Sequence, residues 1–129
     1  MKRLVLIAAL ISSALAGTPA TAQDMAEASK NESRLEDALS ACWKVAATKL
    51  ATESKETADT IVTVVTGSKT ICHEERGAVV NAWIMVATHN GTNNAGALLG
   101  MQSGMAAVDG RAGADKTDLL EAVMTARMK

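Results

Sequence analysis

The sequence predicts an all-α protein: a small helical domain built on an antiparallel helical hairpin with one disulfide, plus one or two short C-terminal helices. Two observations lead to this prediction. Apolar residues recur at three- and four-residue steps along much of the chain, the period of a helix with one buried face. The two cysteines, Cys42 and Cys72, each lie on one of these apolar stripes.

The N-terminus has the layout of a secretory signal peptide over residues 1–22. A basic pair at positions 2 and 3 precedes an apolar run from 4 to 16, and a small-residue stretch then ends in Ala-Thr-Ala at 20–22. This layout predicts cleavage between Ala22 and Gln23. The apolar run is shorter than the roughly 20 residues that a membrane-spanning helix needs, so no stable membrane span is expected after cleavage. The short, Ala-rich style is typical of bacteria and predicts a periplasmic or secreted protein.

Residues 23–129 are expected to form a single small helical domain. This range holds 11 Lys and Arg and 14 Asp and Glu, a formal charge of −3, and it has no Phe, no Tyr and no cluster of basic residues. Nucleic-acid binding is therefore not expected. Leu, Ile and Val together number 19, the same as Ala alone. Such small side chains bury little area, so the domain is expected to need a covalent staple.

The helical hairpin is predicted over about residues 24–88. Its first arm carries an apolar stripe formed by Leu35, Leu39, Cys42, Trp43, Ala46 and Leu50. A polar turn at 51–59 follows, with Ser54 as a candidate N-cap, and the second arm has a seven-residue repeat at Val65, Cys72, Val79 and Val86. The cysteines lie symmetrically about residue 57, so an antiparallel hairpin would place them opposite each other. An exported chain with two such thiols is expected to form the Cys42–Cys72 disulfide.

The stretch 60–66, TIVTVVT, is wholly β-branched, so strand and helix both remain open for it. Its only strand partner would lie around 79–86, and an isolated two-stranded ribbon is marginal. We therefore expect a helix, with a break near Gly67.

The Gly-rich segment 90–114 has a different character. Asn90-Gly91 predicts a turn, and glycines then recur every four residues, the spacing that lets helices approach closely. Two interpretations remain open: a short helix packed on the hairpin, or an exposed face for a protein partner, self-association or a membrane surface. The residues of that interaction face are Gly96, Gly100, Gly104, Met101 and Met105. A loop at 109–115 and a C-terminal helix over 115–129 are expected to follow.

The sequence KTICHEERG, residues 69–77, raises the question of a metal site. Haem attachment needs a second cysteine at position 69, which is lysine, and a zinc-protease helix needs a histidine at position 77, which is glycine. Cysteine and histidine could together form a zinc site, but the usual paired spacings are missing. No metal site and no cofactor are expected, with His73 and His89 as the alternative metal ligands. Methionine pairs could bind Cu(I), but are more typical of core packing.

The residues offer little for catalysis. The chain has two histidines, no tyrosine, no nucleophile elbow and no phosphate loop, and the cysteines are not a C-x-x-C pair. We predict no catalytic residues and no enzyme. The expected function is that of an exported helical protein acting by protein binding or as a stress-related accessory protein. The alternative is a metal-handling periplasmic protein for Zn or Cu. In size, compartment and cysteine number the chain is similar to small periplasmic helical stress proteins, including acid-protective chaperones, although no motif is shared.

Overall fold

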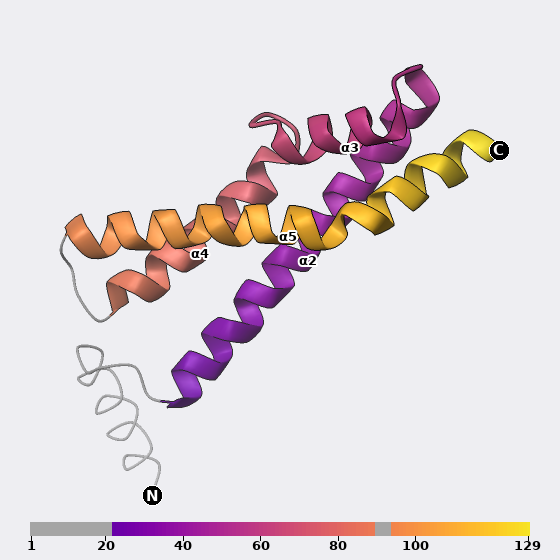
Figure 1. Ribbon diagram of the computed structural model, residues 1–129. Coiled ribbons are helices and arrows are strands. Elements are labelled where there is room, and N and C mark those ends of the chain that lie inside the picture. The colour runs from indigo at the N-terminus through magenta and orange to yellow at the C-terminus, as the bar shows by residue number, and fades with distance from the viewer. Residues whose placement is uncertain (1–21, 90–93) are drawn as a thin grey trace, which may run out of the picture.

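The structure is a computed structural model that describes residues 22–89 and 94–129. Within these ranges the chain forms four helices and no strand, which confirms the all-α prediction (Figure 1). They are α2 (Ala22–Glu53), α3 (Ala58–Gly67), α4 (His73–His89) and α5 (Asn94–Met128). The predicted signal peptide lies outside the described residues except for Ala22.

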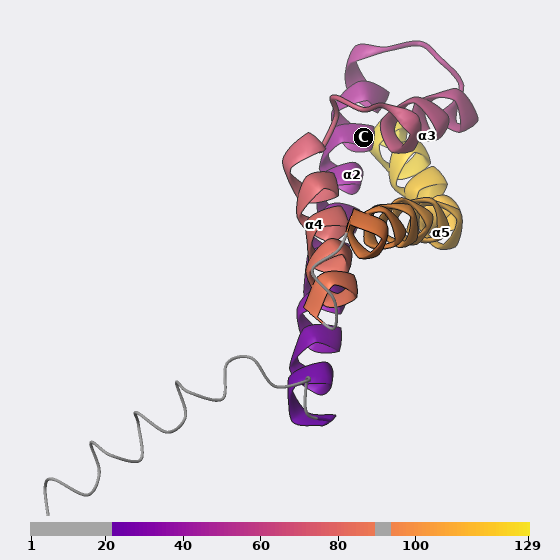
Figure 2. The ribbon, with the colours of Figure 1, turned by 90° about the vertical axis from the view of Figure 1, so that its left-hand side faces the viewer.

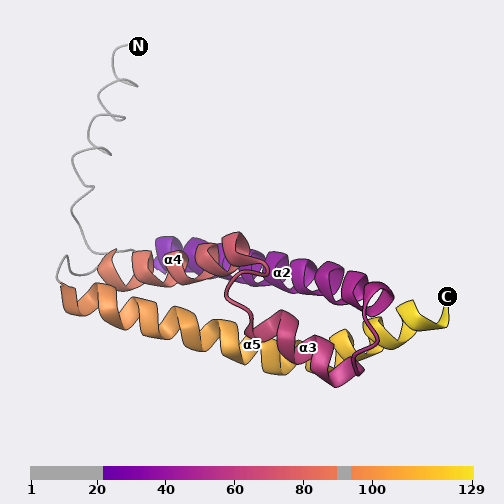
Figure 3. The same ribbon diagram turned by 90° about the horizontal axis from the view of Figure 1, so that it is seen from above.

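The helices form two layers. Viewed from the side and from above, α2 and α4 lie in one layer and α3 and α5 in the other (Figures 2 and 3). α4 runs back along α2, so the predicted antiparallel hairpin is present; α3 precedes α4 in the returning arm and lies in the other layer (Figures 1 and 3). All four helices contribute to the core, whose largest fully buried side chains are Trp43, Leu39, Val65, Val79 and Val123.

The β-branched stretch 60–66 is helical, as expected. Ile61, Val62 and Val65 are buried in the core, so tertiary packing outweighs their strand propensity. The N-cap of α3 is Thr57, whose hydroxyl accepts a hydrogen bond from Thr60 N at 3.2 Å. The prediction of Ser54 as the N-cap is wrong because the helix starts three residues later, and the Ser54 hydroxyl accepts a hydrogen bond from Glu56 N at 3.0 Å within the turn instead.

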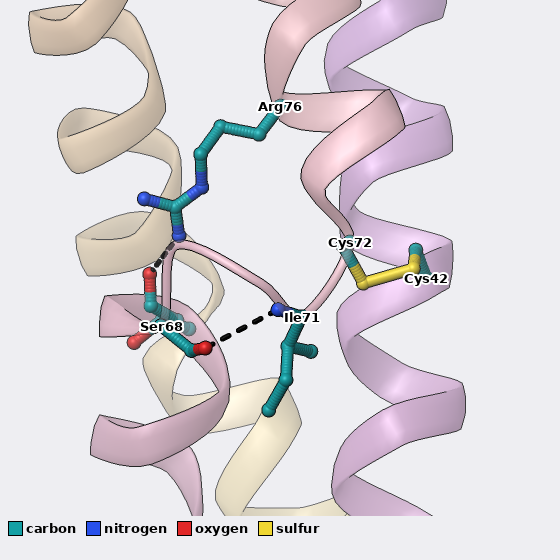
Figure 4. Close-up of a disulfide and its surroundings, with 6 residues drawn as sticks. Cys42, Ser68, Ile71, Cys72 and Arg76 are labelled. Atoms are coloured by element: carbon teal, nitrogen blue, oxygen red, sulfur yellow. Dashed lines mark hydrogen bonds between the residues drawn. A yellow bond between two sulfur atoms is a disulfide. The ribbon is translucent and has the colours of Figure 1, made fainter.

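The second arm of the hairpin is broken after Gly67. Ser68 follows α3, and its hydroxyl accepts a hydrogen bond from Ile71 N at 3.2 Å (Figure 4). Cys72 then takes a φ of 56°, a left-handed conformation that is rare outside glycine. Its carbonyl accepts a hydrogen bond from Arg76 N at 2.9 Å, which starts α4. The break changes the direction of the chain between α3 and α4, and both Val65 before it and Cys72 after it are buried.

α5 is one helix of 35 residues, longer than the sequence predicts. The expected loop at 109–115 is wrong: these residues are helical and continue into the predicted C-terminal helix. Long-range packing explains the difference, since Val108 is buried and Arg111 bonds to residues of α2. Such contacts offset the low helix propensity of Gly110 and Gly113.

None of the helices in the described ranges combines the length and the apolar character that crossing a bilayer requires.

Candidate functional site

The disulfide predicted from the sequence joins α2 to the start of α4. The Cα atoms of Cys42 and Cys72 are 6.0 Å apart, and their sulfur atoms are bonded at 2.02 Å (Figure 4). Cys72 is buried and Cys42 is half-buried. Because both sulfur atoms are in the bond, neither residue is a thiolate that could attack a substrate or bind a metal.

Of the alternative metal ligands, His73 does not form a site with the cysteines. Glu75 places a carboxylate oxygen within 4.8 Å of both sulfur atoms, but the disulfide removes both sulfurs from the ligand set. His73 is exposed at the first position of α4. The side chain of His89 lies outside the described residues.

Two of the predicted interaction-face glycines pack inside the molecule. A Cβ built on Gly100 would lie 2.6 Å from the Cα of Ile84, and one on Gly104 would lie 2.7 Å from the Cα of Val80. Both distances are shorter than any real carbon–carbon contact of this kind, so only glycine lets the backbones of α4 and α5 come this close. The small-residue spacing therefore serves the contact of α5 with α4.

The methionines of the predicted face lie on a different side of α5 and are exposed. Met101 and Met105 follow Leu98 at three- and four-residue steps, so the three share one side of the helix. We call Leu98, Met101 and Met105 the α5 stripe; they are 53%, 40% and 56% exposed. Leu98 was not part of the predicted interaction face, although its three-residue spacing from Met101 is the signal that places it there.

The α5 stripe continues into the hydrophobic core. At the same three- and four-residue steps, this side of the helix carries buried residues further along, namely Val108, Leu119 and Val123. There α5 packs on α2 and α3. In the C-terminal half of α5, helices α2 and α3 cover this apolar side. In the N-terminal half the same side, formed by the α5 stripe, is exposed.

A polar network ties α2 to α5 at its middle. The Arg111 guanidinium donates to Ser40 Oγ at 2.7 Å, Asp115 Oδ2 at 3.2 Å and Asp37 Oδ1 at 2.8 Å. Ser40 Oγ in turn donates to Asp115. Burial alone would lower the pKa of Arg111, but Asp115 and Asp37 outweigh it and raise the pKa above its ordinary value. Arg111 is therefore a permanently charged bridge and not an acid–base group.

A groove of about 560 Å³ runs beside this network, between α2 and the C-terminal half of α5. Its charged lining residues carry both signs, and neither histidine nor cysteine is among them. Among its hydroxyl groups, that of Ser40 is already bonded to Asp115 and to the Arg111 guanidinium. Its lining comprises Ser40, Ala41, Lys44, Thr48, Arg111, Asp115, Asp118, Leu119, Glu121, Ala122, Thr125, Ala126 and Lys129.

Two further arginines cap the C-terminal ends of other helices. Arg127 donates to the carbonyl oxygens of Ala51 at 3.2 Å and Ser54 at 3.0 Å, and also to that of Glu56. Arg76 donates to the carbonyl oxygen of Thr66 at 2.5 Å (Figure 4). The last carbonyls of a helix have no partner within it and favour a cation nearby. Arg127 reaches carbonyls more than 70 residues before it and Arg76 reaches across the break between α3 and α4, so no local sequence pattern reveals these caps.

These features define a class of protein: a small, disulfide-closed helical bundle with an apolar stripe left uncovered on its last helix. Comparisons with protein-family models, with curated proteins and with solved structures found no match.

Proposed function

We propose that this chain is an exported protein that acts by binding a protein partner through the α5 stripe, and not by catalysis. The observation that supports this most directly is the exposure of Leu98, Met101 and Met105 on the same side of α5 that forms the core further along. Contiguous apolar side chains exposed on a protein surface often mark a site of association with a partner.

A helical partner suits this surface. Apolar residues at positions i, i+3 and i+7 are the pattern by which one helix packs against a groove or another helix. Methionine side chains are flexible and adapt to the shape of what they contact. In the C-terminal half of α5 the same side is covered by helices of the chain itself, so a partner helix would extend an existing mode of packing.

Export to the periplasm or to the outside of the cell is supported by the disulfide, since such bonds persist in oxidising compartments. The signal-peptide layout of residues 1–22 points the same way. The intact mass of the protein recovered from the periplasm or medium tests this directly. We expect a chain that starts at Gln23 and lacks the two hydrogens of a dithiol, and a full-length chain with free thiols would contradict it.

Metal handling is the weaker candidate. In the described part of the chain, Cys42, Cys72 and Glu75 place three potential ligand atoms within 4.8 Å of one another, but both cysteines are oxidised. A metal-handling function would therefore depend on His73 and His89 as the ligands.

Site-specific photo-crosslinking tests the binding proposal. A photoreactive residue at position 101 is compared with one at position 124, because Met124 is also an exposed methionine of α5 but lies off the stripe. We expect an adduct of defined mass from position 101 in the exported protein and none from position 124. Equal crosslinking from both positions, or none from either, would contradict a binding role for the stripe.

A further inference from the structure

We infer that the partner of the α5 stripe is a second copy of this chain, paired antiparallel along α5 in a two-fold symmetric dimer. This inference rests on the proposed function, because both use the same surface. It follows from the distribution of charge around the stripe, from the spacing of the stripe along α5 and from the size of the contact.

The stripe lies in a long stretch without charged side chains. Between Arg76 and Asp109 the sequence contains no Asp, Glu, Lys or Arg. This stretch includes most of α4 and the first half of α5, which pack together at one end of the molecule (Figure 1). An uncharged surface cannot pair a charge that a partner brings to it, and an unpaired charge is costly to bury.

A second copy meets this condition with its own identical surface. An antiparallel contact centred near position 101 pairs residues of this stretch of α5 with residues of the same stretch, so neither copy brings a charged α5 side chain to the centre. A foreign partner would need a matching uncharged surface of its own. Electrostatic complementarity of this kind sets specificity more than affinity.

The spacing of the stripe also fits two-fold pairing. An axis that passes between positions 101 and 102 places Leu98 of one copy opposite Met105 of the other, and brings the two Met101 side chains together at the centre. Such isologous contacts, in which one patch meets itself, are the commonest in symmetric dimers. The three- and four-residue steps are also those of helix pairs that interlock their side chains.

A lipid surface fits less well. Helices that lie in the membrane interface usually carry Lys and Arg beside their apolar side. On α5 the first basic residue after the stripe is Arg111, and its guanidinium is bonded to Ser40, Asp37 and Asp115.

The contact is small, so the dimer should be weak. One helix pair interlocking over the stripe covers less than the roughly 800 Å² per partner that stable complexes bury. We therefore expect a dissociation constant in the micromolar range, with monomer and dimer in concentration-dependent exchange.

Analytical ultracentrifugation of the disulfide-bonded chain, from low-micromolar to millimolar concentration, tests this with a charge swap at the centre. Met101→Glu and Met101→Lys each place like charges together and should raise the dissociation constant at least about tenfold. An equimolar mixture of the two variants should associate again, because opposite charges then meet. Met124→Glu is the matched control and should behave as the wild type, since Met124 is 60% exposed and lies off the stripe. The mixture makes the test independent of folding, because a misfolded variant would not be rescued.

The inference is overturned if the wild-type chain stays monomeric throughout this range, or if the Glu and Lys variants fail to associate when mixed. It is also overturned if Met124→Glu weakens the dimer as much as Met101→Glu, or if the monomer binds neutral phosphatidylcholine vesicles through the stripe. A crosslink from position 101 to a different protein, with a monomeric wild type, would overturn the inference and leave the proposed function standing. If position 101 gives no crosslink at all, both the dimer and the proposed binding function are refuted.

Discussion

Replacing Gly100 by alanine adds one methyl group where the backbones of α4 and α5 touch. The new Cβ would lie 2.6 Å from Ile84 Cα and 2.9 Å from Trp83 O, both of which are backbone atoms. A side chain could rotate away from such a contact, but these atoms move only if the two helices separate. The added volume therefore disturbs the whole α4–α5 contact.

The expected loss follows from two opposing effects. Overpacking of a close contact costs about 1–3 kcal/mol, and the backbone clash at Gly100 places it toward the upper end. Alanine recovers about 1 kcal/mol because it favours the helix more than glycine does. The net result for Gly100→Ala is a destabilisation of about 1–2 kcal/mol.

Gly110 provides the matched control on the same helix. A Cβ built there has nothing within 4 Å, so Gly110→Ala gains the helix propensity without the clash. We expect it to stabilise the protein by about 0.5–1 kcal/mol. The two alanine variants should then differ by about 2 kcal/mol or more in free energy of unfolding.

Urea unfolding followed by far-UV circular dichroism measures this difference, with the disulfide intact and at one fixed, low protein concentration. For a domain of this size a 2 kcal/mol difference separates the midpoints by about 1–2 M urea. Gly104→Ala should fall on the side of Gly100→Ala, since its Cβ would lie 2.7 Å from Val80 Cα. If Gly100→Ala proves as stable as Gly110→Ala, the close packing of α4 on α5 is wrong.

Three further predictions concern the disulfide, the helix cap and pH. Replacing both cysteines by alanine should destabilise the protein by about 3.5 kcal/mol, because the covalent loop is lost. A second double variant, Cys42→Ala with Cys72→Gly, should be about 1 kcal/mol more stable than the double-alanine variant, because glycine accepts the left-handed backbone at position 72. If the two variants unfold at the same urea concentration, the backbone at Cys72 is unstrained. Arg127→Ala should cost about 1–2 kcal/mol, since it leaves carbonyls at the end of α2 without their donor, whereas the exposed Lys129→Ala should be neutral in the same titration. Burial and the nearby Glu36 raise the pKa of Glu32. The folded state therefore binds the Glu32 proton more tightly than the unfolded state does. Protonated Glu32 favours folding at acidic pH, and this contribution to stability is lost as the pH rises through the raised pKa. Glu32→Gln should make stability slightly less dependent on pH over that range, and an unchanged pH profile would contradict it.

The hairpin could be predicted because its signals are local or covalent. Helical periodicity identifies the apolar stripe of each arm, and a single cysteine pair fixes how the arms face each other. The stretch 60–66 is harder, since its β-branched residues favour a strand by themselves. The helix forms because it buries Ile61, Val62 and Val65 in the core. The sequence indicated this burial only indirectly, through the predicted hairpin that places these residues against the first arm.

The continuous α5 could not be predicted from local sequence. Gly110 and Gly113 within DGRAGAD indicate a loop, and nothing in the neighbouring residues opposes that signal. What opposes it is the bonding of Arg111 to Asp37 and Ser40, which are more than 70 residues away along the chain. A local pattern cannot report a contact at that separation.

The candidate surface was predicted in part. Its helical spacing was visible in the sequence, and Met101 and Met105 are exposed as an interaction face requires. The glycine spacing indicated a close helix contact, but the sequence did not separate the glycine side of α5 from the methionine side, and both were placed on one interaction face. Gly100 and Met101 are neighbours in the sequence, but successive residues of a helix point about 100° apart, so one serves the contact within the chain while the other remains at the surface.

The disulfide closes a ring of residues 42–72 and leaves two segments outside it: the part of α2 before Cys42, and α4 with α5. The bond between Cys42 and Cys72 encloses the end of α2, all of α3 and the segments that join them, whereas α5 is attached by a single stretch of chain after α4 (Figure 1). A protease that cuts between α2 and α3 opens the ring but leaves one covalent molecule until a reductant is added. A cut between α4 and α5 has the opposite effect, because it frees the helix that carries the contact surface from any covalent link to the rest.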